Sequence, residues 1–335
     1  MDGQYVGIDL HRRRSLIVRK NGDGVTQATT RIANDPMRLA EVIGEAGSHP
    51  SVVVEATYGW YWAVDLLQEL GCDVHLAAPS GLNWGQRRVK NDERDATDLI
   101  DLLCVGRLPE AWIAPPETRE LRELVRYRFK LVGLRTGLKA QVHAVMAKNV
   151  VLPSRIDMFG PGGTAQLDAL ELPVAYTTRL ESLRGLITTL DNEVSTMERQ
   201  VHELLRGDAG YQAIQHLNGV GRVLAAMFCA EIGDVHRFRS AKALCSWAGM
   251  TPRHHESDTK VIRGRVTKQG SRLVRWAAVE AVAHMRGGPK LQVDYHRIAE
   301  RRGVNKARVA VARKLLTLVY YGLRDGEIRA IREAA

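Results

Sequence analysis

Two carboxylates lie near the ends of apolar segments that have the length and composition of buried strands. Asp9 lies in the run Tyr5–Leu10, and Glu55 ends the run Ser51–Glu55. An ionised carboxylate in such a run is costly to bury unless a cation compensates its charge. If both strands lie in the middle of one sheet, the two side chains meet at its edge, where carboxylate oxygens suit Mg²⁺. The pair therefore predicts a metal site.

A third group of acids begins a predicted helix. Asp92 and Asp95 are three residues apart and share one helix face, as do Asp95 and Asp98. A helix N-terminus tolerates such acids through its macrodipole, and each acid taken separately is typical of an ordinary cap or surface charge. Two strand-end acids together with a helix pair in one domain favour a shared metal cluster instead.

The elements that position these acids alternate in type over the first hundred residues. Three short apolar runs predict an antiparallel meander, and helices and buried strands follow them. The expected strands are Tyr5–Leu10, Ser15–Arg19, Gly24–Ile32, Ser51–Glu55 and Asp73–Leu76, and the expected helices are Pro36–Ala46, Tyr58–Leu70 and one that begins near Asp92. This order predicts an α/β domain over residues 1–114.

Two long helices are expected next, over residues 115–207. The first is Glu117–Lys148, and the second begins near Tyr176 after an insert near residues 152–175. The second carries a heptad seam of Leu180, Leu183, Ile187, Leu190, Val194, Met197, Val201 and Leu204. Such a seam predicts a coiled-coil arm, and an internal hairpin or a subunit interface would produce it equally well.

Residues 208–335 are expected to form a third, mainly α-helical domain. Leu217–Gly221 followed by the apolar run Val223–Met227 resembles a helix-hairpin-helix turn, in which backbone N–H groups approach a phosphate. A plain packing joint between two helices is the alternative. The segment Arg253–Lys314 holds 16 Lys and Arg against five Asp and Glu, so it carries the excess of a chain whose net charge is +10. Nucleic acid is therefore the leading partner, and a solvated basic surface is the alternative.

Composition excludes several other classes of protein. The 335 residues are 45% apolar and 6% aromatic, as in ordinary globular proteins, and the four cysteines form no C-x-x-C pair. The sequence contains no long apolar run and opens without a secretory signal. We therefore expect a cytoplasmic protein without a membrane, zinc or disulfide role.

The acidic segments carry a family resemblance. G-I-D at Gly7–Asp9, the run V-V-V-E-A-T-Y-G-W-Y that contains Glu55, and K-N-D-E-R-D-A at Lys90–Ala96 resemble the D-E-D-D tetrad of RuvC-like (RNase H-like) nuclease domains. More narrowly, they resemble the DEDD-type transposases of insertion sequences described as bridge-RNA-guided recombinases. The resemblance favours Asp92 and Asp95 as the ligand pair and leaves Asp98 as a spare acid.

The resemblance continues in the C-terminal half. The segments S-W-A-G-M-T-P at Ser246–Pro252, S-D-T-K at Ser257–Lys260 and G-R-V-T-K-Q-G-S-R-L-V-R at Gly264–Arg275 are similar to consecutive blocks of that family. Family members use a C-terminal serine as the nucleophile toward DNA, which by position is Ser257. Family members commonly have glycine near this serine, whereas here Asp258 follows it. Ser240 is the second candidate, although a helix N-cap explains it better.

What the resemblance implies is a DNA recombinase. Asp9, Glu55, Asp92 and Asp95 would hold Mg²⁺, or Mn²⁺ as a substitute, and Ser257 would form a phosphoserine link. The expected partners are DNA, a structured guide RNA and further copies of the chain in a dimer or tetramer, in a nucleoid-associated protein. Expected contacts to nucleic acid are Arg122, Arg126, Arg128, Arg135, Lys139, Lys260, Arg263, Arg265, Lys268 and Arg272.

Three other functions compete with this interpretation. A Holliday-junction-type nuclease would use the same carboxylates to activate water and would be indifferent to Ser257. A non-catalytic nucleic-acid-binding protein would show no dependence on metal. An actin-like ATPase or sugar kinase is suggested by G-I-D-L-H at Gly7–His11, but the first domain lacks a second glycine-rich phosphate loop.

Overall fold

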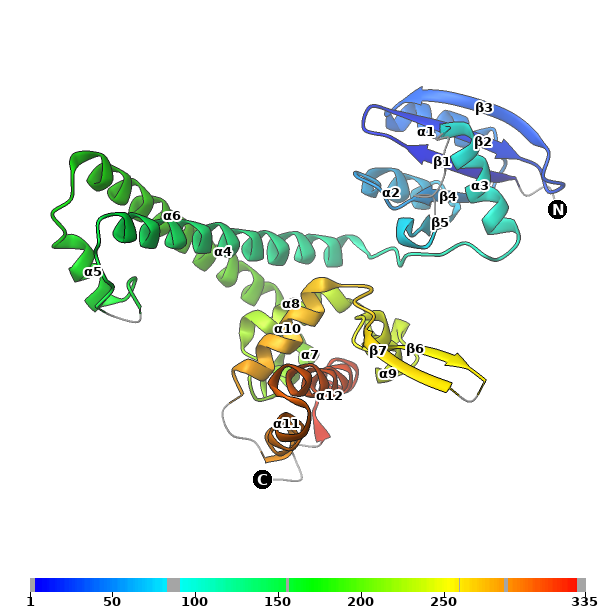
Figure 1. Cartoon of the computed structure of the whole chain (residues 1–335). Helices are drawn as coiled ribbons and strands as arrows, with labels where there is room; N and C mark the ends of the chain where they lie inside the picture. The colour runs from blue at the N-terminus through cyan, green and yellow to red at the C-terminus, as the bar shows by residue number, and fades with distance from the viewer. Residues whose placement is uncertain (1–3, 83–90, 155–156, 259, 286–288, 330–335) are drawn as a thin grey trace. The chain divides into compact units, whose positions relative to one another are not determined.

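The computed structural model describes residues 4–82, 91–154, 157–258, 260–285 and 289–329. These residues form two compact units, Met1–Ile113 and Ala114–Ala335 (Figure 1). The first unit is a mixed α/β structure, and the second is mostly helical. The expectation of an N-terminal sheet followed by a helical C-terminal region is confirmed.

The first unit is built on a five-stranded sheet with the order β3-β2-β1-β4-β5. Its strands are β1 (Tyr5–Leu10), β2 (Arg14–Lys20), β3 (Thr26–Ala33), β4 (Ser51–Glu55) and β5 (Asp73–Ala77). The first three strands form the expected antiparallel meander, and β4 and β5 continue the sheet in parallel. β1 is therefore the central strand.

Each face of this sheet has its own helical cover. On one face, Val6 and Ile8 of β1 pack in a core with α1 (Pro36–Gly44) and α2 (Tyr61–Glu69). On the other face, the strand residues of a second core pack with α3 (Asp92–Cys104), whose own contributions are Ala96, Leu99 and Ile100. Since side chains alternate along a strand, Gly7 and Asp9 of β1 face α3.

The second unit begins with two long helices, α4 (Pro116–Lys148) and α6 (Val174–Leu205), which run side by side (Figure 1). Arg128 is paired with Glu198 and Arg135 with Asp191, so the contacting residue of α6 moves back as that of α4 advances. The helices are therefore antiparallel. The insert between them contains the short helix α5 (Pro161–Asp168).

The predicted heptad seam is largely buried. Leu180, Leu183, Ile187, Val194 and Val201 are all buried. Leu204 is 63% exposed, which corrects the expectation that the seam extends to the end of the helix. α6 contacts α8 as well as α4. Because a further helix packs against it, the buried face of α6 at this end is not set by the a and d positions alone.

The rest of the second unit surrounds one large core. Its helices are α7 (Ala209–Gln215), α8 (Arg222–Ile232), α9 (Ala241–Trp247), α10 (Arg272–Ala283), α11 (Pro289–Arg302) and α12 (Val304–Asp325). One feature of this mainly helical region was not expected. A hairpin of two antiparallel strands, β6 (Pro252–Ser257) and β7 (Lys260–Val266), lies between α9 and α10. The sequence of this hairpin is polar and basic and lacks a clear alternation of apolar and polar residues, so the pattern did not predict strands there.

Candidate active site

The strand register brings Asp9 and Glu55 to the same end of one sheet face. β1 and β4 are parallel, with Gly7 opposite Val53 and Ile8 opposite Val54. Continuing this register sets Asp9 beside Glu55, and both side chains fall on the α3 face because each lies two residues beyond Gly7 or Val53. Asp9 is only 7% exposed, whereas Glu55 is half-buried. The predicted meeting of the two acids therefore has a basis in the backbone.

Gly7 allows α3 to lie directly on β1. A Cβ atom at Gly7 would stand 2.1 Å from the carbonyl oxygen of Ala96 and 3.0 Å from the side chain of Ile100. A side chain of any size at this position would hold the helix away from the strand. The glycine therefore sets how near the acids of α3 come to Asp9, two residues along the same strand.

The first turns of α3 contribute Asp92 and Asp95. Asn91 caps this helix, accepting a hydrogen bond from the backbone N–H of Glu93, and Asp95 is 4% exposed. The far end of α3 is tied to β2 by Lys20, whose Nζ lies 2.5 Å from Asp101 Oδ1. The helix is thus fixed at its middle by packing and near its end by an ion pair. Asp98, the spare acid, is half-buried on the same helix.

His11 is a member of the cluster that sequence reasoning missed. Its Nε2 lies 3.2 Å from Asp9 Oδ2 and 3.5 Å from Asp92 Oδ1. One ligand atom from each of these three residues lies within 4.8 Å of the others. The spacing D-x-H at a strand end is the signal, because residues two apart on an extended chain point to the same side. The basic residues that follow His11 made it look like part of a solvated turn.

The donor set of this cluster fits a divalent cation. Asp9 and Asp92 offer the hard carboxylate oxygens that Mg²⁺ and Mn²⁺ prefer. His11 offers an imidazole nitrogen, which is a more usual ligand for transition metals. Glu55 lies on the same sheet face as Asp9, and Asp95 lies on the same helix as Asp92, but neither belongs to this three-residue group, and their role as ligands stays a prediction.

Ser257 lies at the tip of the unexpected hairpin. It is the last residue of β6, it pairs with Lys260 of β7, and it is exposed. Asp258, which follows it, has φ +51°, a left-handed conformation that an Asp side chain tolerates better than most. Glycine adopts this conformation without strain, so a glycine at this position would also fit the hairpin tip.

The base of the hairpin is locked to α9 by backbone contacts. Gly270 has φ +66°, and a Cβ atom there would stand 1.7 Å from the carbonyl oxygen of Trp247. Arg275 donates through Nη1 to the carbonyl oxygens of Ala248, Gln269 and Gly270, at 3.0, 2.5 and 3.2 Å. This last arginine of the C-terminal motif therefore holds two loops together.

The arginines predicted to contact nucleic acid from the first long helix all have partners inside the second unit. Arg126 pairs with Glu231, and Arg122 donates to the carbonyl oxygens of Ala230 and Glu231. Arg128 and Arg135 pair with acids of α6, as described above. Lys139 Nζ lies 4.5 Å from the ring centroid of Phe159. Their contact with nucleic acid stays a prediction, and packing accounts for the four arginines.

The C-terminal cations lie on or next to the hairpin. Arg265 of β7, Lys268 and Arg272 of α10 are exposed. Lys260 and Arg263 belong to β7, and their side chains lie outside the described part of the structure. Exposure leaves the first three able to meet a phosphate, as the sequence predicts.

The structure bears on two alternatives raised by the sequence. Ser240 is the N-cap of α9, and its side chain accepts a hydrogen bond from the backbone N–H of Ala243, so the cap interpretation is confirmed. The turn at Leu217–Gly221 packs against α10, since a Cβ atom at Gly219 would stand 2.1 Å from the carbonyl oxygen of Ala281. The turn therefore serves as a packing joint, with Gly221 as the N-cap of α8, and its approach to a phosphate stays a prediction.

This fold and these acids define a DEDD-type nuclease-like domain joined to a helical C-terminal region. A family model for DEDD transposases of the IS110 type matches residues 6–149, and a model described as "Transposase IS116/IS110/IS902 family" matches residues 211–296. The first match covers the first unit and runs on through α4 of the second unit, the second match lies within the second unit, and together they cover more than half of the chain. The chain belongs to the IS110/IS116 family of DEDD transposases.

Individual relatives agree with this assignment. The chain is 28% identical over 227 residues to a "Probable family 20 transposase" of Pseudomonas aeruginosa, covering 64% of each chain. It is 24% identical over 286 residues to the "Transposase for insertion sequence element IS1111A" of Coxiella burnetii, covering 80% of this chain and 76% of the relative. With the "Transposase for insertion sequence element IS1328" of Yersinia enterocolitica it shares 23% identity over 96% of this chain and 97% of the relative. The first of these matches spans slightly less than two thirds of the relative's length.

Among the described helices, none is long and apolar enough to cross a membrane.

Proposed function

We propose that this transposase cuts and rejoins DNA through a phosphoserine intermediate at Ser257, supported by a metal site at Asp9, Glu55, Asp92 and Asp95. The observation that carries the proposal is the group of Asp9, His11 and Asp92, in which one ligand atom of each residue lies within 4.8 Å of the others. Asp9 and Glu55 end neighbouring parallel strands, and Gly7 brings the helix that bears Asp92 and Asp95 against them. Four acids on one surface repel one another unless a cation compensates them.

The carboxylates would hold Mg²⁺, with Mn²⁺ as a substitute. A divalent cation bound there polarises the phosphodiester and stabilises the charge of the attacking and leaving oxygens. The role of the chain is to keep the ligands fixed. Lys20 anchors α3 through Asp101, and His11 lies between Asp9 and Asp92 as a further ligand or as a hydrogen-bonding neighbour.

Ser257 supplies the covalent step. Its Oγ attacks the scissile phosphorus, an Oγ–P bond forms, the bond from phosphorus to one deoxyribose oxygen breaks, and the hydroxyl proton passes to the departing oxygen. The hydroxyl of another DNA end then attacks the phosphoserine and releases Ser257. No phosphodiester energy is lost, so the exchange needs no nucleotide cofactor. The exposed position of Ser257 at a hairpin tip supports its delivery to a phosphate held elsewhere, within one subunit or across an oligomer.

The remaining parts of the proposal concern partners. The pair α4 and α6 acts as a coiled-coil arm in a dimer or tetramer, and a structured RNA from the element guides the choice of target. The exposed cations Arg265, Lys268 and Arg272 support contact with a phosphate backbone. Base pairing of the guide RNA would carry sequence specificity, as in other RNA-guided proteins.

The test is a search for a covalent protein–DNA adduct. The full chain is incubated with the ends of its element, the flanking RNA and Mg²⁺, and the products are separated under denaturing conditions. We expect the wild type and Ser240→Ala to form the adduct, and Ser257→Ala and Asp9→Asn to lose it. Replacing Mg²⁺ with EDTA should abolish the adduct in every variant.

Two outcomes would give the protein a different function. Cleavage without an adduct, retained in Ser257→Ala and lost in Asp9→Asn, would identify a hydrolytic nuclease of the Holliday-junction type. Binding of DNA or RNA without any metal-dependent cleavage would identify a non-catalytic nucleic-acid-binding protein.

A further inference from the structure

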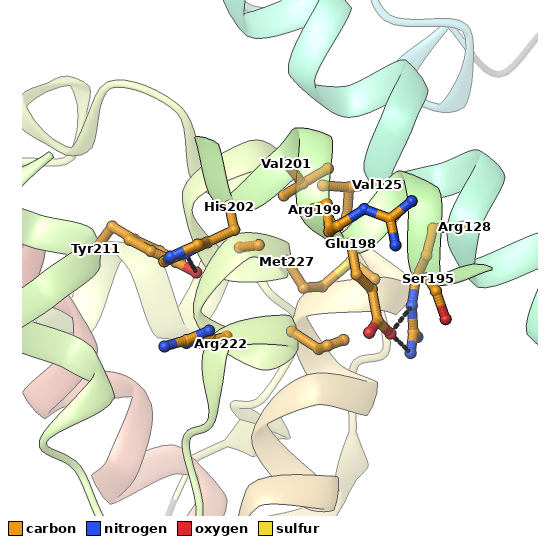
Figure 2. A pocket seen from close by; sticks show the side chains of 12 residues that line it. Val125, Arg128, Ser195, Glu198, Arg199, Val201, His202, Tyr211, Arg222 and Met227 are labelled. Carbon is orange, nitrogen blue, oxygen red and sulfur yellow. Dashed lines mark hydrogen bonds and ion pairs between the residues drawn. The ribbon is translucent and has the colours of Figure 1, made fainter. Parts of the chain in front are cut away.

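A cavity of about 300 Å³ lies inside the second unit, away from Ser257 and its hairpin. Its walls come from α4, α6, α7 and α8, so it forms where the two long helices meet the C-terminal core (Figure 2). This volume is at the lower end of the range for small-molecule sites. The cavity therefore suits one small group and excludes a length of double helix.

The inner surface of the cavity is apolar on one side and hydrogen-bonding on another. Val201, Val223 and Met227 line it. Figure 2 shows the rings of His202 and Tyr211 close together, with Met227 near them. His202 Nδ1 lies 3.2 Å from the hydroxyl oxygen of Tyr211. Burial raises the pKa of Tyr211 further above neutral, so its hydroxyl is protonated there and has one proton to donate, either to His202 or to a ligand. Such a site fits a flat heterocycle that has polar atoms on its edge.

The rim of the cavity is cationic. It bears Arg128, Arg199 and Arg222 against a single acid, Glu198. Arg128 is already paired with Glu198, with Nε at 2.9 Å from Oε1, whereas Arg199 and Arg222 are exposed. The surplus at the rim is therefore two positive charges. An occupant should carry negative charge outside the cavity and an uncharged flat group inside it.

The N-terminus of α8 adds to this field. Arg222 is the first residue of that helix, which spans 11 residues, and the N-cap is Gly221 with no side-chain hydrogen bond to the cap. The free backbone N–H groups of a first turn attract anions, and more so beside an arginine. The positive end of the helix and the cationic rim thus favour the same kind of ligand group.

We propose that this cavity binds one unstacked nucleotide of a single-stranded nucleic acid, with its base inside and its phosphate at Arg222. Nucleobases combine an apolar face with polar edge atoms, and their backbone supplies the anion, which matches the three features of the site. The proposal rests on the proposed function only in taking nucleic acid as the partner. RNA and DNA share the required chemistry, and the experiment distinguishes them.

The experiment measures binding of the full chain to single strands in EDTA, where no cleavage can occur. The probes are fluorescein-labelled 12-mers of uridylate and of deoxyuridylate, and the duplex of deoxyuridylate with deoxyadenylate. Val223→Phe fills the cavity, Arg222→Gln removes one rim charge, and Arg179→Gln is the control. Arg179 is an exposed arginine of the same helix as Arg199, about 30 Å away along its axis.

We expect Val223→Phe to weaken single-strand binding about tenfold, the effect typical of losing one stacked base, and to leave duplex binding unchanged. Arg222→Gln should weaken it several-fold and reduce the salt dependence by about 0.7 in log–log slope, as for one lost phosphate contact. Arg179→Gln should bind as the wild type does. If Val223→Phe weakens binding of the RNA strand more than that of the DNA strand, the bound nucleotide belongs to RNA, and the reverse result identifies DNA.

A cross-linking measurement keeps the proposal testable if Val223→Phe does not fold. Strands that carry 5-iodouracil are irradiated on the wild-type protein, and the attached peptide is identified by mass spectrometry. Attachment at Tyr211 or His202 supports the proposal. Attachment only elsewhere overturns it, as does equal binding by the wild type and a folded Val223→Phe, or an equal loss in Arg222→Gln and Arg179→Gln.

These outcomes are separate from those of the adduct experiment. A protein that binds single strands through the cavity but forms no adduct would refute the serine mechanism alone. A protein that forms the adduct while its single-strand binding is indifferent to Val223→Phe would refute the cavity proposal alone.

Discussion

Replacing Gly7 with alanine tests how tightly the acidic cluster depends on one backbone contact. The new Cβ would stand 2.1 Å from the carbonyl oxygen of Ala96, whereas such contacts essentially never fall below 3.0 Å. Neither backbone can deform locally within a close-packed core. The helix α3 must therefore move away from β1 as a whole, by about 1 Å. Asp92 and Asp95 move with it, away from Asp9.

The expected cost is larger for chemistry than for folding. Overpacking a core by one methyl group destabilises a protein by about 1 to 3 kcal/mol. A displacement of about 1 Å between groups that act on one substrate lowers a rate by about 100-fold. We therefore expect Gly7→Ala to remain folded at 25 °C, to bind Mn²⁺ more weakly, and to form the DNA adduct about 100-fold more slowly than the wild type.

The measurement combines thermal unfolding, Mn²⁺ binding followed by electron paramagnetic resonance, and the rate of adduct formation. Gly22→Ala is the matched control, since a Cβ atom there would meet nothing within 4 Å. It should behave as the wild type in all three assays. If Gly7→Ala retained wild-type metal affinity and rate, the acids of α3 would not act together with Asp9, and the metal cluster would have to be abandoned.

Two further predictions concern the second unit. Glu231→Gln should lower the thermal unfolding temperature by several degrees, because Glu231 is 4% exposed and its charge-assisted hydrogen bonds from Arg126 and Ser271 are weakened, at a cost of about 2 kcal/mol. Glu198→Gln is its control and should shift the temperature by less than about 2 °C, since the Glu198 side chain is 39% exposed; equal shifts would contradict the argument. Alkylation by iodoacetamide at pH 8 should modify Cys104, which is exposed, long before Cys245, which is buried and whose thiol pKa is raised by that burial. The rate of alkylation at Cys104 should rise with pH, because its own raised pKa leaves little thiolate at pH 8. Peptide mapping that found Cys245 modified first would show that the core around α9 opens readily.

The sheet and its acids were predictable because local signals and tertiary structure agree there. The apolar runs around Val6–Ile8 and Val52–Val54 have the length of buried strands, and an acid at the end of each is conspicuous. The seam of α6 was predictable for the same reason, since a spacing of three and four residues repeats over its length. The exposure of Leu204 was not, because a third helix changes the inward side at that end.

The residues that sequence reasoning missed depend on contacts between distant segments. His11 joins the acids only because α3 brings Asp92 back to the end of β1, 81 positions later in the chain. The prediction that Arg126 contacts nucleic acid did not take Glu231 into account. Glu231 lies in an apolar helical segment, and the sequence alone does not show that its side chain is buried beside Arg126. Local composition identifies a charge, but only the fold shows which charge it meets.

Both parts of the proposed chemistry depend on backbone contacts that only glycine permits. Gly7 sets the distance between Asp9 and the acids of α3, and Gly270 fixes the base of the hairpin that ends at Ser257. Both contacts join backbone to backbone, so a new side chain cannot be relieved by choosing another rotamer. The reacting groups can therefore be displaced by a single added methyl while the hydrophobic cores of both units stay intact. For this reason we expect variants at the two glycines to lose recombination before they lose the fold, which is the reverse of what a purely structural role for these positions predicts.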